Sequence, residues 1–286
     1  MTNMKIGLIL LLLSLFHSST ICHVIRTINL SKKFVKNSIK GKGWGLNIYN
    51  IFDKKSDNDN SFYALNRINV TLENTNVIAF IGPSGAGKST LAKCLIGREL
   101  YDDGNIIIDN DYDVIGAYLD HLFCQTYDQN LTINQLFQFL YNKYSKEVEE
   151  MSSYRDIMDL INTLPMNEKV SSLLESQKKI FELIYAILQA EINTIATNKC
   201  ISKFSYIVVL DEYLDKDATS VRSNIYRTMK LLSHHPKLQL QVIIITHSKA
   251  VFNNFCDKVI VLKEGRLYFE GNPKKAFLPN QLQMIE

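Results

Sequence analysis

The chain has 286 residues, of which 46% are hydrophobic and 21% charged. This length is enough for one well-buried α/β domain, or for a large and a small lobe, and the composition is ordinary for a globular protein. The net charge of +3 is small and dispersed along the chain, so we predict no nucleic-acid partner. The five cysteines include no CxxC pair and leave an odd one over. This argues against a disulfide framework and a structural zinc site, so we expect free thiols.

The N-terminus has the pattern of a targeting segment. Lys5 precedes an apolar run over 6–16, and small polar residues follow that run. This order is typical of a signal peptide. We therefore predict a signal peptide or targeting segment over 1–22 and a folded domain over 23–286. The apolar run is shorter than the roughly 20 residues of a membrane span, although an uncleaved anchor and a buried N-terminal element remain as alternatives.

The first part of the domain predicts strands on both sides of a polar segment. Residues 24–30 are rich in β-branched side chains and predict a strand. Residues 35–61 are rich in Lys, Gly, Asn and Asp, which indicates a loop insertion. We expect a second strand over 68–72 and a buried strand over 77–81. A glycine-rich loop then leads into a helix that begins near Lys88.

The rest of the domain predicts helices followed by buried strands. Residues 126–203 carry helical periodicity, and we predict that they form a helical lobe. Residues 206–210 and 242–246 are short apolar runs, typical of strands buried in a parallel sheet. Residues 259–262 and 267–269 flank a short turn and predict a hairpin. The expected architecture is an α/β fold with a mixed sheet core and an inserted helical lobe.

The glycine-rich loop fits the pattern G-x-x-x-x-G-K-[ST] in full. Its residues, all predicted to contact the nucleotide, are Gly82, Pro83, Ser84, Gly85, Ala86, Gly87, Lys88, Ser89 and Thr90. The glycines let consecutive backbone N–H groups curl around a β-phosphate. Lys88 would neutralise the β- and γ-phosphates of ATP, and the Ser89 hydroxyl would ligate Mg²⁺. The helix that follows would direct its positive end at the anion.

A second motif ends an apolar strand in two carboxylates. Residues 207–210 are apolar and precede Asp211 and Glu212. Asp211 lies where a Walker B aspartate holds Mg²⁺ through water, and Glu212 where a general base orients the attacking water. Such a strand is weak evidence alone and becomes strong when it is paired with the P-loop.

From about 24 to 277 the chain resembles the ABC ATPase family. The loop GPSGAGKST has the usual sequence of the Walker A loop in that family, and residues 102–109 resemble the strand that follows its P-loop helix. The hairpin over 259–273 is also similar. The resemblance implies a P-loop NTPase fold of the ABC nucleotide-binding type, with ATP and Mg²⁺ as cofactors.

The resemblance also implies two further catalytic residues. Gln125 precedes the stretch 130–133 as the glutamine of a Q-loop does, and would contact Mg²⁺ and the attacking water and couple to a partner subunit. His247, which follows the strand at 243–245, is similar to the H-loop histidine that contacts the γ-phosphate. In isolation, Gln125 would be interpreted as an exposed loop residue. His247 would be interpreted as a strand-end histidine that forms its hydrogen bonds with the backbone. Their order and spacing favour the functional interpretation.

The adenine of ATP needs an aromatic platform. By the family pattern this residue comes shortly after the first strand, so Phe34 is the first candidate and Tyr63, after the insertion, is the second. A core or surface aromatic is an equal alternative for either.

The resemblance weakens at the signature loop, LSGGQ in the family. The best match is 173–177, where Leu174 offers no hydroxyl and Glu175 brings a negative charge toward the partner's γ-phosphate. The stretch from this loop to Asp211 is longer than usual, which implies an insertion near 190–203. After Glu212, Asp217 is the nearest equivalent of the D-loop aspartate. The resemblance therefore implies a heterodimer with a second ABC ATPase chain that has an intact signature loop.

The function predicted from these motifs is an ATP-hydrolysing ABC subunit that energises a separate membrane-spanning partner. A soluble ABC ATPase in iron–sulfur cluster assembly is one alternative, suggested by a loose similarity over 175–183. A nucleotide-binding regulatory subunit with little hydrolysis is the other. An N-terminal targeting signal and free thiols would both fit an organelle reached through the secretory route, such as a plastid, or a membrane-associated location.

Overall fold

The computed structural model describes eight segments of the chain: residues 24–35, 61–72, 77–109, 113–143, 164–197, 204–233, 240–247 and 249–276. The predicted targeting segment over 1–22 lies outside the described residues. Most of the predicted insertion over 35–61 does too. Its two end residues belong to strands, since Val35 ends β1 (Ile25–Val35) and Ser61 begins β2 (Ser61–Ile68).

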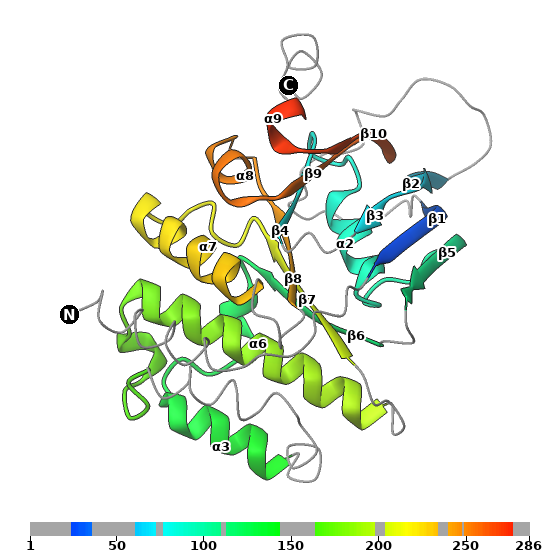
Figure 1. Cartoon of the computed structure of the whole chain (residues 1–286). Coiled ribbons are helices and arrows are strands. Elements are labelled where there is room, and N and C mark those ends of the chain that lie inside the picture. Colours follow the sequence, from blue (N-terminus) through cyan, green and yellow to red (C-terminus); the bar gives the residue numbers. More distant parts are fainter. Residues whose placement is uncertain are drawn as a thin grey trace, which may run out of the picture.

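A six-stranded sheet forms the centre of the molecule (Figure 1). Its strands, in spatial order, are β10 (Arg266–Gly271), β9 (Lys258–Lys263), β4 (Val77–Ile81), β8 (Leu240–Ile245), β7 (Phe204–Asp211) and β6 (Asp113–Asp120). All neighbours are parallel except the β9–β10 hairpin. The predicted buried strands and the hairpin are confirmed, and β6 is an additional strand that the sequence did not indicate.

The central sheet is apolar on both faces because helices or strands cover each side. Along β4, Val77 and Ala79 face one core, while Ile78 and Phe80 face the other. This alternation follows from the pleat, which directs successive side chains to opposite faces. The continuous apolar runs that identified these strands in the sequence are the result.

A smaller antiparallel sheet covers one of those faces. It contains β1, β2, β3 (Thr71–Leu72) and β5 (Asp103–Ile108), and β1 pairs with each of the others. Helix α2 (Lys88–Leu95) lies between the two sheets (Figure 1). The strand expected over 68–72 is wrong as one element. It is split because the Val70 backbone donates to the Thr27 hydroxyl and the Asn69 amide donates to the Arg67 carbonyl, which turns the chain.

Helices cover the opposite face. They are α3 (Ile133–Lys143), α6 (Glu175–Thr197), α7 (Thr219–Ser233), α8 (Lys249–Phe255) and α9 (Pro273–Ala276), with 3₁₀ turns η3 (Phe123–Gln125) and η4 (Val170–Ser172). Of these, α3, η4 and α6 fall within the predicted lobe over 126–203. Helix α6 packs against β6 and α7, and it continues through much of the stretch where an insertion was expected.

The apolar residues at 173, 174, 180, 181, 184, 187 and 188 predict one buried face for this helix, and one of them is exposed. Phe181, Ile184 and Leu188 are buried as expected, whereas Leu174 is 69% exposed. The reason is that Leu174 precedes the first turn of α6, where its backbone N–H donates to the Gln177 side chain at 3.1 Å. The helical repeat that would have directed it into the core therefore begins one residue later.

Two further expectations concern cysteines and membrane spans. Cys94, Cys124 and Cys256, the cysteines within the described segments, are free thiols as predicted. In the same part of the chain, no helix combines the length and the apolar character that crossing a bilayer requires.

Candidate nucleotide-binding site

The loop between β4 and α2 has a backbone that only glycine permits. Gly82, Gly85 and Gly87 have φ angles of 146°, 79° and 97°, in the region that L side chains rarely adopt. A Cβ on Gly82 would lie 2.0 Å from the Leu262 carbonyl oxygen, and one on Gly87 would lie 2.3 Å from the Ala64 carbonyl oxygen. The loop is therefore held closely between the end of β9 and strand β2.

Lys88 begins α2 and is folded back over this loop. Its side chain is buried, and its ammonium donates to the carbonyl oxygens of Gly82 at 2.8 Å and Pro83 at 2.9 Å. Burial lowers the pKa of Lys88, and the carboxylates of Glu212 and Asp211 oppose that shift. No acidic residue occupies the first turn of α2, so the positive end of the helix is not neutralised locally. The loop thus combines a fixed cation with a helix N-terminus, as phosphate binding requires.

Ser89 and Asp211 meet at the hydroxyl of Tyr118. Strand β6 places Tyr118 beside β7, and the phenol donates a hydrogen bond to Asp211 Oδ2. Burial is the largest cause of a raised pKa of Tyr118, followed by the Asp211 bond, while a hydrogen bond with Ser89 lowers it. Sequence reasoning missed Tyr118 because β6 itself carried no strand signal.

This arrangement fits a Mg²⁺ ion bound with a nucleotide. A serine hydroxyl and a carboxylate that share one neighbour are the hard oxygen donors that Mg²⁺ prefers. In the described residues, no group of three or more His, Cys, Asp or Glu side chains could hold a metal by itself. With a nucleotide bound, phosphate oxygens and water would supply the remaining ligands of the ion.

Glu212 and His247 come together at the carboxyl ends of β7 and β8. Glu212 has a φ of 51°, and its backbone N–H donates to the Ile245 carbonyl at 2.9 Å. A non-glycine residue in this conformation costs about 1–3 kcal/mol. Glu212 Oε1 lies 3.1 Å from His247 Nε2, and both side chains are about half exposed. A carboxylate and an imidazole thus face the side of the sheet where the P-loop lies.

Gln125 lies farther along the chain than the end of β6. It is the last residue of η3, is exposed, and its backbone N–H donates to the Leu122 carbonyl at 2.9 Å. Strand β6 ends at Asp120, which is paired directly with Asp211 in the sheet. The Mg²⁺ and water contacts of Gln125 therefore stay a prediction.

The two candidate adenine platforms lie on neighbouring strands. Phe34 is half-buried and its ring is 6.0 Å from that of Phe62, with the Lys32 ammonium 5.1 Å from the Phe34 centroid. Tyr63 is 47% exposed and precedes Ala64, the residue whose carbonyl touches Gly87. Tyr63 is therefore covalently adjacent to a residue that contacts the P-loop. The role of either ring stays a prediction.

Comparison with known proteins agrees with this geometry. Residues 65–196 match the family described as ABC transporter. The chain is 27% identical over 238 residues to a methionine import ATP-binding protein, MetN, of Protochlamydia amoebophila, covering 80% of this chain and 66% of that protein. It is 26% identical to a sulfate/thiosulfate import ATP-binding protein, CysA, of Mesostigma viride, covering 79% and 63% of the two chains. This chain thus spans a little under two thirds of the length of these relatives.

Solved structures show the same fold at low sequence identity. The protein cbiO1 of Clostridium perfringens, part of the ABC transporter complex cbiONQ, superposes with a TM-score of 0.55 at 21% identity, covering 90% of this chain and 92% of that one. A dimeric ATP-binding cassette bound to ADP and phosphate gives 0.54 at 18% identity, covering 87% and 98%. The chain therefore has the mixed α/β fold of a P-loop nucleotide-binding domain. Its sequence and its fold are similar to those of ABC-type ATP-binding proteins, the family that the sequence resembles.

Proposed function

We propose that this chain is the ATP-binding and ATP-hydrolysing subunit of an ABC transporter. The observation that supports this most is the convergence of Lys88, Ser89, Asp211, Glu212 and His247 on one edge of the central sheet. The names of the relatives support it as well, because MetN and CysA are import ATP-binding proteins.

Each of these residues has a role in that reaction. The P-loop amides and the Lys88 ammonium bind the β- and γ-phosphates, with the whole stretch Gly82–Thr90 around them. Ser89 and Asp211 would hold Mg²⁺, and that ion would offset the negative charge of the phosphates. Glu212 accepts the proton of the attacking water, and the His247 imidazole, 3.1 Å from Glu212, fixes that carboxylate and reaches the γ-phosphate. Gln125 and Phe34 complete the site as water-orienting and adenine-contacting residues.

The partner chains follow from the N-terminus of α6. Leu174 and Glu175 are both exposed, so they are available to a neighbouring chain. A carboxylate there repels the γ-phosphate of the partner's ATP. We therefore infer that this chain pairs with a second ABC ATPase chain carrying an intact signature loop, and that the pair drives a separate membrane-spanning subunit.

Purification of a tagged full-length chain from detergent-treated membranes tests this function. We expect a multi-span membrane protein and a second P-loop ATPase to co-purify with it. A Lys88→Ala variant serves as a control for nucleotide-dependent association. Exclusive recovery of soluble assembly factors, with no membrane-spanning protein, would contradict the transport function.

A further inference from the structure

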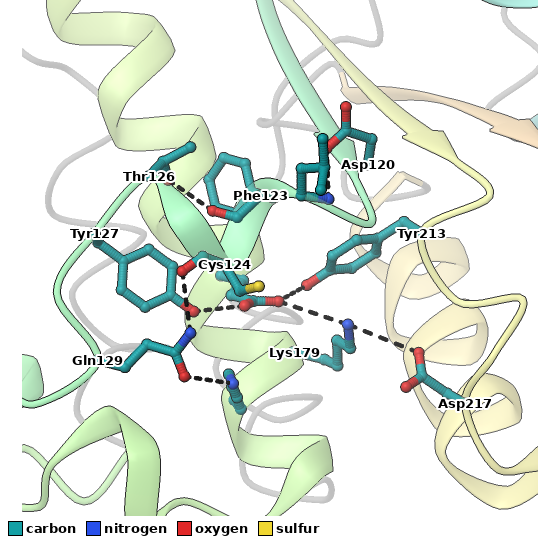
Figure 2. Close-up of polar contacts among 12 residues, drawn as sticks. Asp120, Phe123, Cys124, Thr126, Tyr127, Gln129, Lys179, Tyr213 and Asp217 are labelled. Atoms are coloured by element: carbon teal, nitrogen blue, oxygen red, sulfur yellow. Dashed lines mark hydrogen bonds and ion pairs between the residues drawn. The ribbon is translucent and has the colours of Figure 1, made fainter. Parts of the chain in front are cut away.

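A buried carboxylate lies near the nucleotide site but outside the residues assigned to it. Glu182, on α6, is 1% exposed. One of its oxygens accepts a hydrogen bond from the Tyr127 hydroxyl and the other from the Tyr213 hydroxyl. Figure 2 shows both rings directed at this carboxylate, with Lys179 beside it. The Lys179 ammonium is 3.7 Å from Glu182 Oε2 and 4.0 Å from the Tyr213 ring centroid.

The two tyrosines belong to different segments of the proposed site. Tyr127 follows η3 and is the second residue after Gln125, whereas Tyr213 directly follows Glu212. Glu182 stands between them on the helix that begins at Glu175. One carboxylate therefore joins the Gln125 segment, the Glu212 segment and α6.

Further contacts reinforce the same connection. Lys179 also reaches Asp217 Oδ2 at 3.7 Å, farther along the segment that follows β7. Lys178 donates to the Gln129 side chain at 3.0 Å, and Gln129 donates to the Cys124 carbonyl at 3.2 Å (Figure 2). Helix α6 is thus tied to each of the two segments by more than one polar contact.

The chemistry at the centre requires a carboxylate. Burial, together with Glu182, raises the pKa of both Tyr127 and Tyr213, so both phenols remain protonated and donate. Two donors and an ammonium around one side chain are satisfied by an ionised carboxylate, which only accepts. An amide of the same shape would present N–H groups to one of the tyrosines.

We propose that Glu182 is a positioning residue for ATP hydrolysis. Through its hydrogen bonds to Tyr127 and Tyr213, it holds the Gln125 and Glu212 segments in fixed positions relative to α6. Nucleotide binding at the P-loop therefore increases the order of both segments. This inference rests on the proposed function, because it requires ATP binding at the P-loop. It assigns Glu182 itself no contact with ATP.

Hydrogen exchange of the full-length chain, with and without ATP and Mg²⁺, tests the proposal. In the wild type, nucleotide should slow exchange at 82–90, 123–131 and 212–217. In Glu182→Gln, protection at 82–90 should persist to within about twofold, while the nucleotide-dependent protection at 123–131 should fall by about tenfold, as expected when ordering by an intervening contact is lost.

Glu191→Gln is the matched control. Glu191 is also fully buried on α6, but it lies about 13 Å farther along the helix at 1.5 Å per residue. This variant should respond to nucleotide as the wild type does. If Glu182→Gln does not fold, Tyr127→Phe and Tyr213→Phe each remove one hydroxyl, and each should reduce the response at its own segment.

The outcomes separate this proposal from the proposed function. Equal protection at 123–131 and 212–217 in wild type and Glu182→Gln would overturn the role of Glu182 alone. So would an equal loss in Glu191→Gln, because that loss would reflect a general loosening of α6. Absence of protection at 82–90 in the wild type would instead overturn ATP binding and, with it, both conclusions.

Discussion

At the scale of single residues, Lys88 supplies positive charge beside the Glu212 and Asp211 carboxylates, where the phosphates of ATP would bind. Its buried ammonium donates to the Gly82 carbonyl of the loop, and it interacts electrostatically with Glu212 and Asp211. Lys88→Ala should weaken ATP–Mg²⁺ binding by roughly 10²–10³-fold, because two phosphates would then lack a counter-charge at close range. Calorimetric titration measures this directly, with the exposed Lys274→Ala as control. Unchanged affinity in Lys88→Ala would contradict phosphate binding at this loop.

Glu212 separates binding from chemistry. Glu212→Gln keeps the size of the side chain but removes the base, so nucleotide affinity should be retained while hydrolysis slows by about 10²–10⁴-fold. Phosphate release under single-turnover conditions is the appropriate measurement, performed with the partner chain once it is identified. If turnover in the variant equals that of the wild type, Glu212 is not the general base.

Cys94 offers a test that is independent of nucleotide. Burial raises the pKa of this thiol to about 11 and also raises that of Cys256. Because only the thiolate reacts, the reactive fraction of Cys94 at pH 8 should be about 100-fold below that of an unperturbed thiol, and its alkylation should accelerate as pH rises toward 11. Among the three cysteines that the structure describes, mass spectrometry of the folded chain should find half-exposed Cys124 modified before Cys94 and Cys256. Preferential labelling of Cys94 at pH 8 would show that its surroundings are open.

At the scale of elements, β6 shows what the sequence left out and why. Strands β4, β7, β8 and β9 were predictable because each contains a continuous apolar run. Strand β6 contains Gly116, which weakens a strand pattern. The structure explains the glycine, since a Cβ there would lie 2.4 Å from Ile96 Cβ, at the end of α2.

Gly116→Ala should therefore separate β6 from α2. We expect a loss of about 1–3 kcal/mol in the free energy of unfolding, as for other overpacked sites. Gly97→Asn is the control, because Gly97 has a φ of 70° and a Cβ added there would meet nothing within 4 Å, and Asn tolerates this conformation. Urea unfolding of both variants gives the comparison. Equal losses of unfolding free energy in the two variants would mean that the close approach of residue 116 to Ile96 does not cause the destabilisation.

Part of the candidate site was predictable from contiguous residues, and part depends on contacts between residues that are distant in the sequence. The P-loop and the Asp211–Glu212 pair were predictable because contiguous residues carry their chemistry. The contacts of Glu182 were not, because Tyr127 and Tyr213 are distant in sequence and look like core aromatics. The helical repeat assigned Leu174 to the buried face of α6, whereas the structure exposes it, because the repeat predicts a face but not the residue at which the helix begins.

At the scale of the whole molecule, the open question is which chain completes this one. Leu174 and Glu175 lie at the exposed start of α6, where a head-to-tail partner would meet them. Two copies of this chain should pair poorly around ATP, because each would direct a carboxylate at the other's γ-phosphate. We therefore expect the wild-type chain to sediment mainly as a monomer with ATP, and Glu212→Gln, which traps the nucleotide, to do the same.

Restoring the loop should reverse this behaviour. Leu174→Ser, Glu175→Gly and Ser176→Gly together supply a hydroxyl and remove the charge, and Ser is a favourable residue at the position before a helix. Two glycines in the first turn of α6 cost about 1 kcal/mol each, so the single variant Glu175→Gln, which removes only the charge, serves as a milder companion. In sedimentation with ATP and Mg²⁺, the triple variant should form dimers and Glu175→Gln should show a weaker shift in the same direction. A tight ATP-dependent homodimer of the unaltered chain would show that Glu175 points away from the partner's phosphate, and the expectation of a heterodimer would fall with it.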